Sequence, residues 1–281
     1  MKFKIAIAGK GGTGKTTLAS LFIRNIIEAE KGNILALDAD PNSNLNELLG
    51  VKIEGTVGQL VEDFKKNGAV ISSGLYKDQA VEMNIHRIIT EGKGFDLLVM
   101  GRGEGPGCYC AANNLFKKYI DVLQQNYPVV VMDNEAGMEH LSRKTTQNMD
   151  YLLIVSDPSP RGIMAAKRIK ELAGELNIKA GKILLVVNRV GQECYTGTMK
   201  NNGNPEKIAD ESTEVKEAGL GLLDDRILSL LEGSGLEVTG IVENDASLAD
   251  MELDGRNIFD LLPDSISLKQ TGQILKKLNI I

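Results

Sequence analysis

A short glycine-rich segment constrains this chain more than any other part of its sequence. It runs from Gly9 to Thr17, reads Gly-Lys-Gly-Gly-Thr-Gly-Lys-Thr-Thr, and directly follows the apolar run Phe3–Ala8. A glycine-rich turn between a strand and a helix directs backbone N–H groups at a phosphate, and the helix N-terminus adds favourable charge. The pattern G-x-G-x-x-G alone would be weak evidence for a dinucleotide site, but Lys15 and Thr16 complete a P-loop for a nucleoside triphosphate. The residues expected to bind the nucleotide here are Gly11, Gly12, Thr13, Gly14, Lys15, Thr16 and Thr17.

A second lysine, Lys10, occupies a position where most P-loops have none. The loop curls away after the strand, so a cation there is poorly placed to serve its own nucleotide. With K-G-G-x-G-K-T-T, the segment resembles the deviant Walker A ATPases, the class of MinD, ParA and the nitrogenase iron protein. The resemblance implies an ATP-dependent homodimer in which Lys10 contacts the partner subunit's nucleotide. The alternative is an ordinary solvated loop lysine.

Composition narrows the classes of function. The chain has 281 residues, 42% of them hydrophobic, so we expect a single P-loop ATPase domain over residues 1–281. The net charge is −6 and no long run of Lys and Arg occurs, so no nucleic-acid partner is expected. No long apolar segment predicts a membrane span, and the first eight residues are too short for a signal peptide. Three cysteines suit a reducing cytosol, and we expect a cytoplasmic protein.

Continuous apolar runs alternate with amphipathic segments along the chain. Runs that are apolar on both faces are typical of buried parallel strands, and amphipathic helices supply the crossovers between them. The sequence therefore predicts a doubly wound, mostly parallel α/β sheet with ligands at the carboxyl ends of its strands. The predicted strands are Ile5–Ala8, Ile34–Leu37, Leu97–Met100, Val129–Met132, Tyr151–Val155, Ile183–Val187 and Val238–Val242, and the predicted helices are Thr16–Glu30, Asn113–Gln125, Pro160–Leu176 and Asp224–Glu232.

Acidic residues follow two of the predicted strands. Asp38 and Asp40 end the second strand, where a carboxylate pair beside a triphosphate needs a cation or water between its members. Asp38 is thus a candidate Mg²⁺ partner, and Asp40 a candidate for orienting the attacking water. Asp133 is placed as a Walker B acid that holds Mg²⁺ together with Thr16, and Gly137 could donate its N–H to the γ-phosphate. The family resemblance equates these segments with switch I and switch II.

Two simpler interpretations of these acids stay open. The pair before Leu45 could cap a helix there, and Asp133 could be a helix cap. Beyond the switches, the family resemblance gives Asn188 the role of reading the adenine edge, with Arg189 beside it. We expect Lys10, Lys15 and Asp40 to be the catalytic residues.

The pair Cys108 and Cys110 follows the strand Leu97–Met100 and precedes a predicted helix. Thiolates near a helix N-terminus have a lowered pKa and bind metals well, but a tetrahedral thiolate site needs four sulfurs. Cys194 is isolated, and His86 and His140 lack ligand-like spacing, so a two-fold axis would have to complete the set. A surface thiol pair or a strained redox disulfide are the alternatives.

The cysteine pair narrows the resemblance. A deviant Walker A ATPase with Cys-x-Cys ahead of a helix is similar to the CooC and AcsF maturation ATPases, which implies nickel insertion into a client carbon monoxide dehydrogenase or acetyl-CoA synthase. The implied cofactors are ATP and Mg²⁺, with Ni²⁺ or Zn²⁺ at the cysteines. One rival is a positioning role like that of MinD and ParA, whose membrane contact would use the apolar stripe in Ser267–Ile281. The other is an iron–sulfur reductase, although Asp133 to Gly137 contains no thiol.

Overall fold

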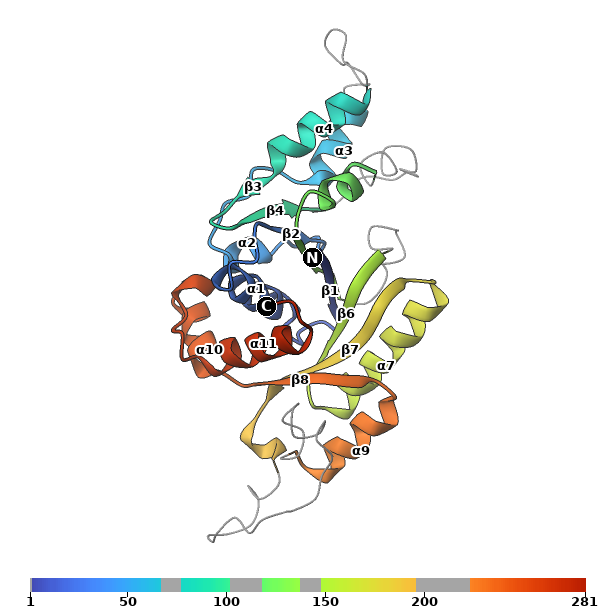
Figure 1. The fold of residues 1–281 in the computed structure, drawn as a ribbon, viewed down its shortest axis with the longest axis vertical. Helices are drawn as coiled ribbons and strands as arrows, with labels where there is room; N and C mark the ends of the chain where they lie inside the picture. The colour runs from blue at the N-terminus through green and yellow to red at the C-terminus, as the bar shows by residue number, and fades with distance from the viewer. Residues whose placement is uncertain (1, 67–76, 102–117, 137–147, 196–222) are drawn as a thin grey trace.

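The computed structural model describes residues 2–66, 77–101, 118–136, 148–195 and 223–281, and the remaining residues lie outside this description. Strands and helices alternate along most of the chain (Figure 1). The strands are β1 Phe3–Gly9, β2 Ile34–Asp38, β3 Thr90–Glu91, β4 Phe95–Val99, β5 Val129–Asp133, β6 Asn148–Ser156, β7 Lys179–Val190 and β8 Glu237–Glu243. The helices are α1 Lys15–Glu28, α2 Leu45–Leu48, α3 Val57–Lys66, α4 Lys77–Ile88, α7 Pro160–Glu175, α9 Asp225–Ser234, α10 Ala246–Leu253 and α11 Ile266–Lys277, with 3-10 turns η1 Gln192–Cys194 and η3 Ile258–Asp260. Residues 118–124 are also helical.

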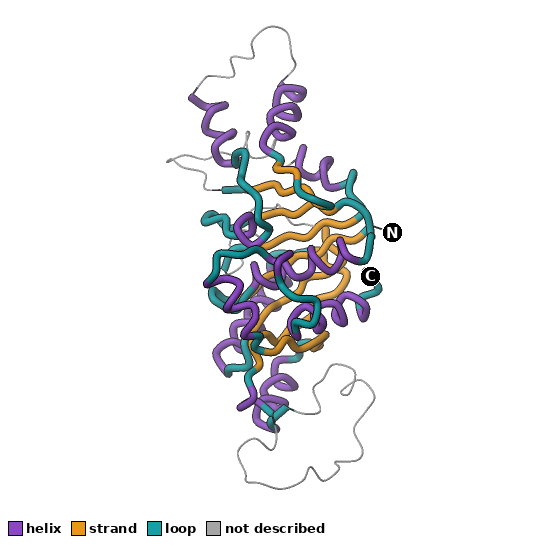
Figure 2. The backbone as a smooth tube through the Cα atoms, turned by 90° about the vertical axis from the view of Figure 1, so that its left-hand side faces the viewer, coloured by secondary structure: helices purple, strands orange, loops and turns teal. Residues whose placement is uncertain are grey.

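All the described strands join one sheet in the order β3-β4-β2-β5-β1-β6-β7-β8. Every neighbouring pair is parallel except β3 with β4, and the strands follow one another along the long axis of the molecule (Figure 2). The predicted doubly wound, mostly parallel sheet is confirmed. All seven predicted strands lie in it, because each is apolar toward both faces and helices cover both.

Alternate residues of the strands serve two hydrophobic cores. In β1, Ile5 and Ile7 belong to the core beneath α1, α2, α10 and α11, whereas Ala6 and Ala8 belong to the core beneath α3, α4, α7 and α9. This alternation follows from the two-residue period of a strand. With both faces covered, the carboxyl ends of the strands become the place where polar side chains can gather.

The apolar stripe near the end of the chain is part of the core. Leu268, Ile274, Leu275 and Leu278 are at most 5% exposed, and α11 packs against β8 and α1. The stripe is therefore a packing surface of the domain. Among the described residues, no helix combines the length and apolarity needed to cross a bilayer.

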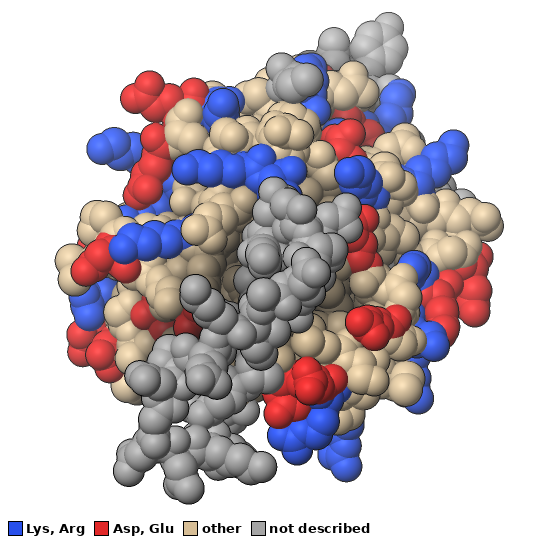
Figure 3. Space-filling view, turned by 60° about the horizontal axis from the view of Figure 1, so that its bottom comes forward, with Lys and Arg blue, Asp and Glu red and all other residues tan. Residues whose placement is uncertain are grey.

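Charged side chains of both signs are interspersed on the face that Figure 3 turns toward the viewer. Lysine and arginine groups there stand next to aspartate and glutamate groups, between tan surface regions. A surface that binds nucleic acid through its phosphates concentrates positive charge on one side. This face does not have that distribution among its described residues.

Arg24 joins α1 to the turn η3. Its guanidinium is buried, and Nη1 donates to the carbonyl oxygens of Ile258 at 2.7 Å and Leu261 at 2.6 Å. Nε donates to Glu28 at 2.7 Å. A buried carbonyl needs a hydrogen-bond partner, so one side chain holds this turn against the helix that begins at the P-loop.

Replacing Arg24 should therefore destabilise the protein. Arg24→Met keeps the aliphatic stem but leaves the buried carbonyl of Leu261 without its donor, while that of Ile258 keeps only the N–H of Leu261 at 3.4 Å. We expect this change to cost about 1–3 kcal/mol of unfolding free energy. Urea denaturation followed by circular dichroism measures the free energy of unfolding of each variant. Arg168→Met, which alters an exposed arginine of α7, is the control and should change the value by less than about 0.5 kcal/mol. Equal effects of the two variants would contradict the role of Arg24.

Candidate nucleotide site

The loop after β1 has the backbone of an anion-binding P-loop. Gly12 and Gly14 have φ of 82° and 86°, in the left-handed region that glycine adopts without strain. Gly14 is the N-cap of α1, no side chain caps this helix, and its first turn contains no acidic residue. The N–H groups at the start of α1 therefore have no competing carboxylate, as a phosphate site requires.

The two lysines of the loop have different surroundings. Lys15 is 8% exposed and its Nζ donates to the carbonyl oxygen of Lys10 at 3.4 Å, whereas the Lys10 side chain is exposed. Burial lowers the pKa of Lys15, and the negative charges of Asp133 and Asp40 partly oppose that shift. Lys15 thus faces the interior of the site and Lys10 faces solvent.

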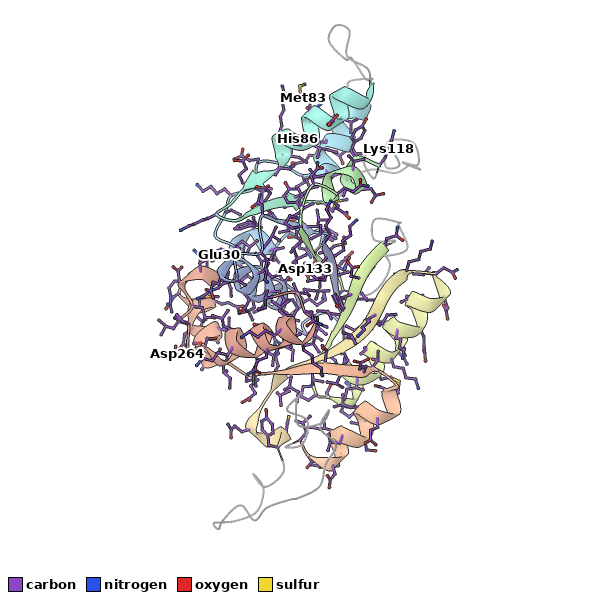
Figure 4. All side chains as sticks on the ribbon, viewed as in Figure 1. Glu30, Met83, His86, Lys118, Asp133 and Asp264 are labelled. Carbon is purple, nitrogen blue, oxygen red and sulfur yellow. The ribbon has the colours of Figure 1, made fainter. Side chains whose placement is uncertain are left out.

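Asp133 is a buried acid at the end of β5, and Figure 4 labels it near the middle of the molecule. It is 1% exposed, its register partner on β2 is Asp38, and the hydroxyl of Thr16 donates to its carboxylate. Burial, together with the negative charge of Asp38, raises the pKa of Asp133 to about 7 against the lowering effects of Thr16 and Lys15. Its Oδ1 atom has no hydrogen-bond partner among the described residues. A buried carboxylate oxygen beside a hydroxyl fits a hard cation such as Mg²⁺, which prefers oxygen ligands.

Asp38 is fully buried, and both of its carboxylate oxygens are occupied. Oδ1 accepts from the N–H of Asp40 at 3.0 Å, and Oδ2 accepts from the N–H of Leu45, the first residue of α2, at 3.1 Å. Burial raises the pKa of Asp38 to about 6, against the opposing effect of these two donors. The capping interpretation is therefore correct for Asp38, whose side chain accepts from the first residue of α2. Asp38 also lies opposite Asp133 on the neighbouring strand.

Asp40 begins the loop between β2 and α2. Its Oδ1 accepts from the N–H of Asn42 at 2.8 Å, and its carbonyl oxygen accepts from the N–H of Ser43 at 3.1 Å. These turn contacts hold Asp40 partly exposed at the carboxyl edge of the sheet, within electrostatic range of Lys15. This is where a residue that orients water near a phosphate would have to stand.

Two buried asparagines hold the backbone on this side of the sheet, one at strand β1 and one at the P-loop. Asn134, which the sequence did not single out, donates from Nδ2 to the carbonyl oxygen of Ile7 at 3.0 Å. Asn188 donates from Nδ2 to the carbonyl oxygen of Thr13 at 2.8 Å. Both side chains are buried. Asn188 thus lies beside the P-loop, near where a nucleotide would bind. In this structure its side-chain amide holds the loop.

Arg189 stands next to Asn188 with a strained backbone. Its φ is 58°, which is uncommon for a non-glycine residue, and the side chain is exposed. Its Nε lies 3.8 Å from where a Cβ on Gly14 would stand. The end of β7 therefore brings both residues of the predicted pair to the P-loop.

Two other residues predicted to bind the nucleotide have contacts within the protein. A Cβ added at Gly11 would lie 3.5 Å from the Cβ of Ala136, and the carbonyl oxygen of Thr17 accepts from the hydroxyl of Ser20.

Several predicted residues lie outside the described part of the chain: Cys108, Cys110, Gly137 and His140. Cys194 is a buried free cysteine, 7% exposed, and His86 is an exposed residue of α4. Within the described ranges, no three His, Cys, Asp or Glu side chains form a group that could hold a metal ion.

Comparison with known proteins agrees with this geometry. Residues 4–211 match the model of the CobQ/CobB/MinD/ParA nucleotide binding domain. The chain belongs to this family. An uncharacterized ATP-binding protein of Methanocaldococcus jannaschii is 39% identical over 98% of this chain and 97% of its own length. The carbon monoxide dehydrogenase accessory protein CooC of Rhodospirillum rubrum is 32% identical over 69% of this chain and 77% of its own length.

Solved structures of MinD and ParA proteins share the fold of this MinD/ParA-type domain. MinD in the MinC:MinD complex of Aquifex aeolicus has a TM-score of 0.66 and 20% identity over 99% of this chain and 95% of its own. The ATP complex of Cyanothece McdA(D38A) has a TM-score of 0.64 and 17% identity over 100% of this chain and 97% of its own. The fold and the family together identify the protein as an ATP-binding domain of the MinD/ParA type.

The buried charge of Asp133 should make stability depend on pH. A carboxyl whose pKa is raised on folding destabilises the native state when ionised, so its cost is greatest above pH about 7 and falls away toward pH about 4. With metal chelated and nucleotide absent, Asp133→Asn should raise the melting temperature at pH about 8, and this gain should shrink as the pH falls. Scanning calorimetry measures it. Asp250→Asn, at an exposed site, should give no such trend; a constant gain for Asp133→Asn would contradict the assignment.

A pair of glycine substitutions tests the packing of Asn188 on the loop. An added Cβ at Gly14 would lie 2.4 Å from Nδ2 of Asn188, whereas one at Gly12 meets nothing within 4 Å. Both positions have a positive φ, so Gly12→Ala reports the backbone strain alone. Gly14→Ala should lower the melting temperature more than Gly12→Ala does. The excess should shrink when both are measured in an Asn188→Ala background; an unchanged excess would rule out this contact as its cause.

Proposed function

We propose that this protein is a dimerising maturation ATPase that hydrolyses ATP to assist nickel insertion into an enzyme of the carbon monoxide dehydrogenase or acetyl-CoA synthase type. Its similarity to CooC over 69% of the chain is the observation that carries the proposal. The pair Cys108 and Cys110 supplies a soft metal-binding sequence, and the exposed Lys10 supplies a cation that could reach a second subunit.

The residues of the site support phosphoryl transfer to water. The N–H groups at the start of α1 and the ammonium of Lys15 bind the phosphates and oppose their developing charge. Thr16 and Asp133 would hold Mg²⁺, which when bound supplies further positive charge between the phosphate oxygens. Asp40 orients the attacking water from the neighbouring loop. Asp38 holds that loop through its two backbone hydrogen bonds.

One contact connects this site to the cysteine-bearing segment. The N–H of Met100 donates to the carbonyl oxygen of Asp38 at 2.8 Å, and Cys108 follows only a few residues later in the sequence. The chain that leads to the cysteines therefore leaves the sheet beside the acid that holds the loop of Asp40. This supports a coupling of nucleotide state to metal binding, in which each ligand changes the affinity for the other.

The two rival functions have less support. A positioning ATPase that binds membranes through its tail would need an available apolar stripe, but α11 buries that stripe against β8 and α1. An iron–sulfur reductase of the same kind as the nitrogenase iron protein would need a thiol in switch II. The segment Asp133 to Gly137 has none.

Metal binding and assembly can be tested together. With ATP, Mg²⁺ and Ni²⁺ present, sedimentation velocity should show a dimer, and equilibrium dialysis should show about one Ni²⁺ per two chains, the ratio that a four-thiolate site requires. Cys108→Ser/Cys110→Ser should lose the nickel. Lys10→Ala should keep ATP binding but lose at least about tenfold in dimer affinity and turnover.

Cys194→Ser is the matched control, because it removes a buried thiol that is remote in sequence from the pair. It should leave nickel binding unchanged. Retained nickel in the double cysteine variant would reject the metal site, while a chain that stays monomeric with all ligands bound would reject the dimer mechanism. A brown iron-containing protein from anaerobic purification would favour the reductase instead.

A further inference from the structure

Four large apolar side chains are exposed along one short stretch at the edge of the molecule. Leu253 ends α10 and is 86% exposed, Leu262 is 65% exposed, and Phe259 and Ile266 are each 38% exposed. We call residues 253–266 the α10–α11 surface. It lies beside α10 at the left of Figure 1, and Figure 4 labels its Asp264 at the outer edge. Four of the eight large apolar side chains that are exposed among the described residues fall in this one stretch, which makes it a candidate interaction site.

The two leucines of this stretch, Leu253 and Leu262, lie outside the buried core. In the same stretch Ile258 and Leu261 are 0% and 4% exposed and fill the interior beneath η3. Phe259 stacks on Phe95 with ring centroids 6.1 Å apart, which leaves part of its ring uncovered. The inner side of the turn is therefore already packed, and the outward-facing leucines are a separate feature of the surface.

The backbone of this surface is firmly held. Arg24 binds the carbonyl groups of Ile258 and Leu261, as described above. At the end of β8, the carboxylate of Asp245 accepts from the N–H of Ser247 at the start of α10 and from the N–H of Ser267 in α11. A pre-organised surface loses less conformational entropy when a partner binds.

Exposed acidic side chains outnumber the cations in the same stretch of the sequence. The cations in residues 250–269 are Arg256, which is paired with Asp254 at 2.9 Å, and Lys269. The exposed acids are Asp250, Glu252, Asp254, Asp260 and Asp264. The net negative charge disfavours an anionic lipid surface and favours a cationic partner.

We propose that the α10–α11 surface binds a basic, amphipathic helical segment of a partner protein. Apolar side chains at helical spacing on that segment would contact Leu253, Leu262 and Ile266, while its lysines or arginines would face the acids around them. The surface uses none of the residues of the nucleotide site. This inference therefore does not depend on the proposed ATPase function.

A designed peptide provides the probe. A fluorescein-labelled helix of about five turns, with leucines in an i, i+3, i+4, i+7 stripe and lysines elsewhere, should bind the full chain in fluorescence anisotropy. Leu253→Ser/Leu262→Ser should weaken binding at least about tenfold, since each leucine loses buried apolar area. Glu252→Lys/Asp264→Lys should weaken it to a similar extent and flatten its salt dependence.

Matched variants on α7 separate this site from general adhesion. Met164→Ser removes another exposed apolar side chain, and Glu171→Lys/Glu175→Lys makes the same charge change, so neither should alter binding. A peptide of the same composition without the stripe should bind at least about tenfold more weakly. Equal affinity for all variants, or no binding by the wild-type chain, would overturn the proposal. The proposal would also be overturned if the wild-type chain formed a dimer that Leu253→Ser/Leu262→Ser dissociates. Binding of the wild-type chain to anionic vesicles, abolished by the same variant, would overturn it as well.

Discussion

The buried carboxylate of Asp133 is the constraint on which the site depends. It lies at the end of β5 in register with Asp38, and one of its oxygens has no partner among the described residues. Keeping such a group ionised in the interior is costly unless a cation is near. Lys15 is the cation that the chain provides, and its own pKa is lowered by burial. The ionised forms of Lys15 and Asp133 therefore stabilise each other.

The order of the strands makes this arrangement possible. Because β1 lies between β5 and β6, the P-loop begins beside Asp133, and β2 brings Asp38 and Asp40 to the other side of the same acid. Neutral groups then hold the backbone here, with Asn134 bonded to Ile7 of β1 and Asn188 bonded to Thr13 of the loop. Neutral amides hold the backbone without adding charge. The charged groups of the site are therefore Lys15, Asp38, Asp40 and Asp133.

The sequence predicted the sheet well because its strands are apolar on both faces, a local pattern. The P-loop was equally local, as one short segment contains both its turn residues and its charged groups. The helices α3, α4, α10 and α11 were not among the predicted elements, and a helix at α2 entered only as the alternative in which Asp38 and Asp40 cap it. The contacts of Asn134 and Asn188 join residues 127 and 175 positions apart, which no local pattern can reveal. For Asp38 the sequence left capping and metal chemistry as alternatives, but its side chain caps while its register places it against Asp133.

Asp38 also shows how one residue can serve two neighbouring segments. Its carboxylate holds the loop that contains Asp40, and its carbonyl oxygen accepts from Met100, the point where the chain leaves β4 toward the cysteines. Protonation of Asp38 and Asp133, or a cation beside them, would change the charge that orders the loop of Asp40. Met100, directly after β4, is bonded to the same residue, Asp38. Within one subunit, then, the site already contains a physical connection between the phosphate-binding edge and the strand that precedes the cysteine pair. A dimer formed through Lys10 would add to this connection rather than create it.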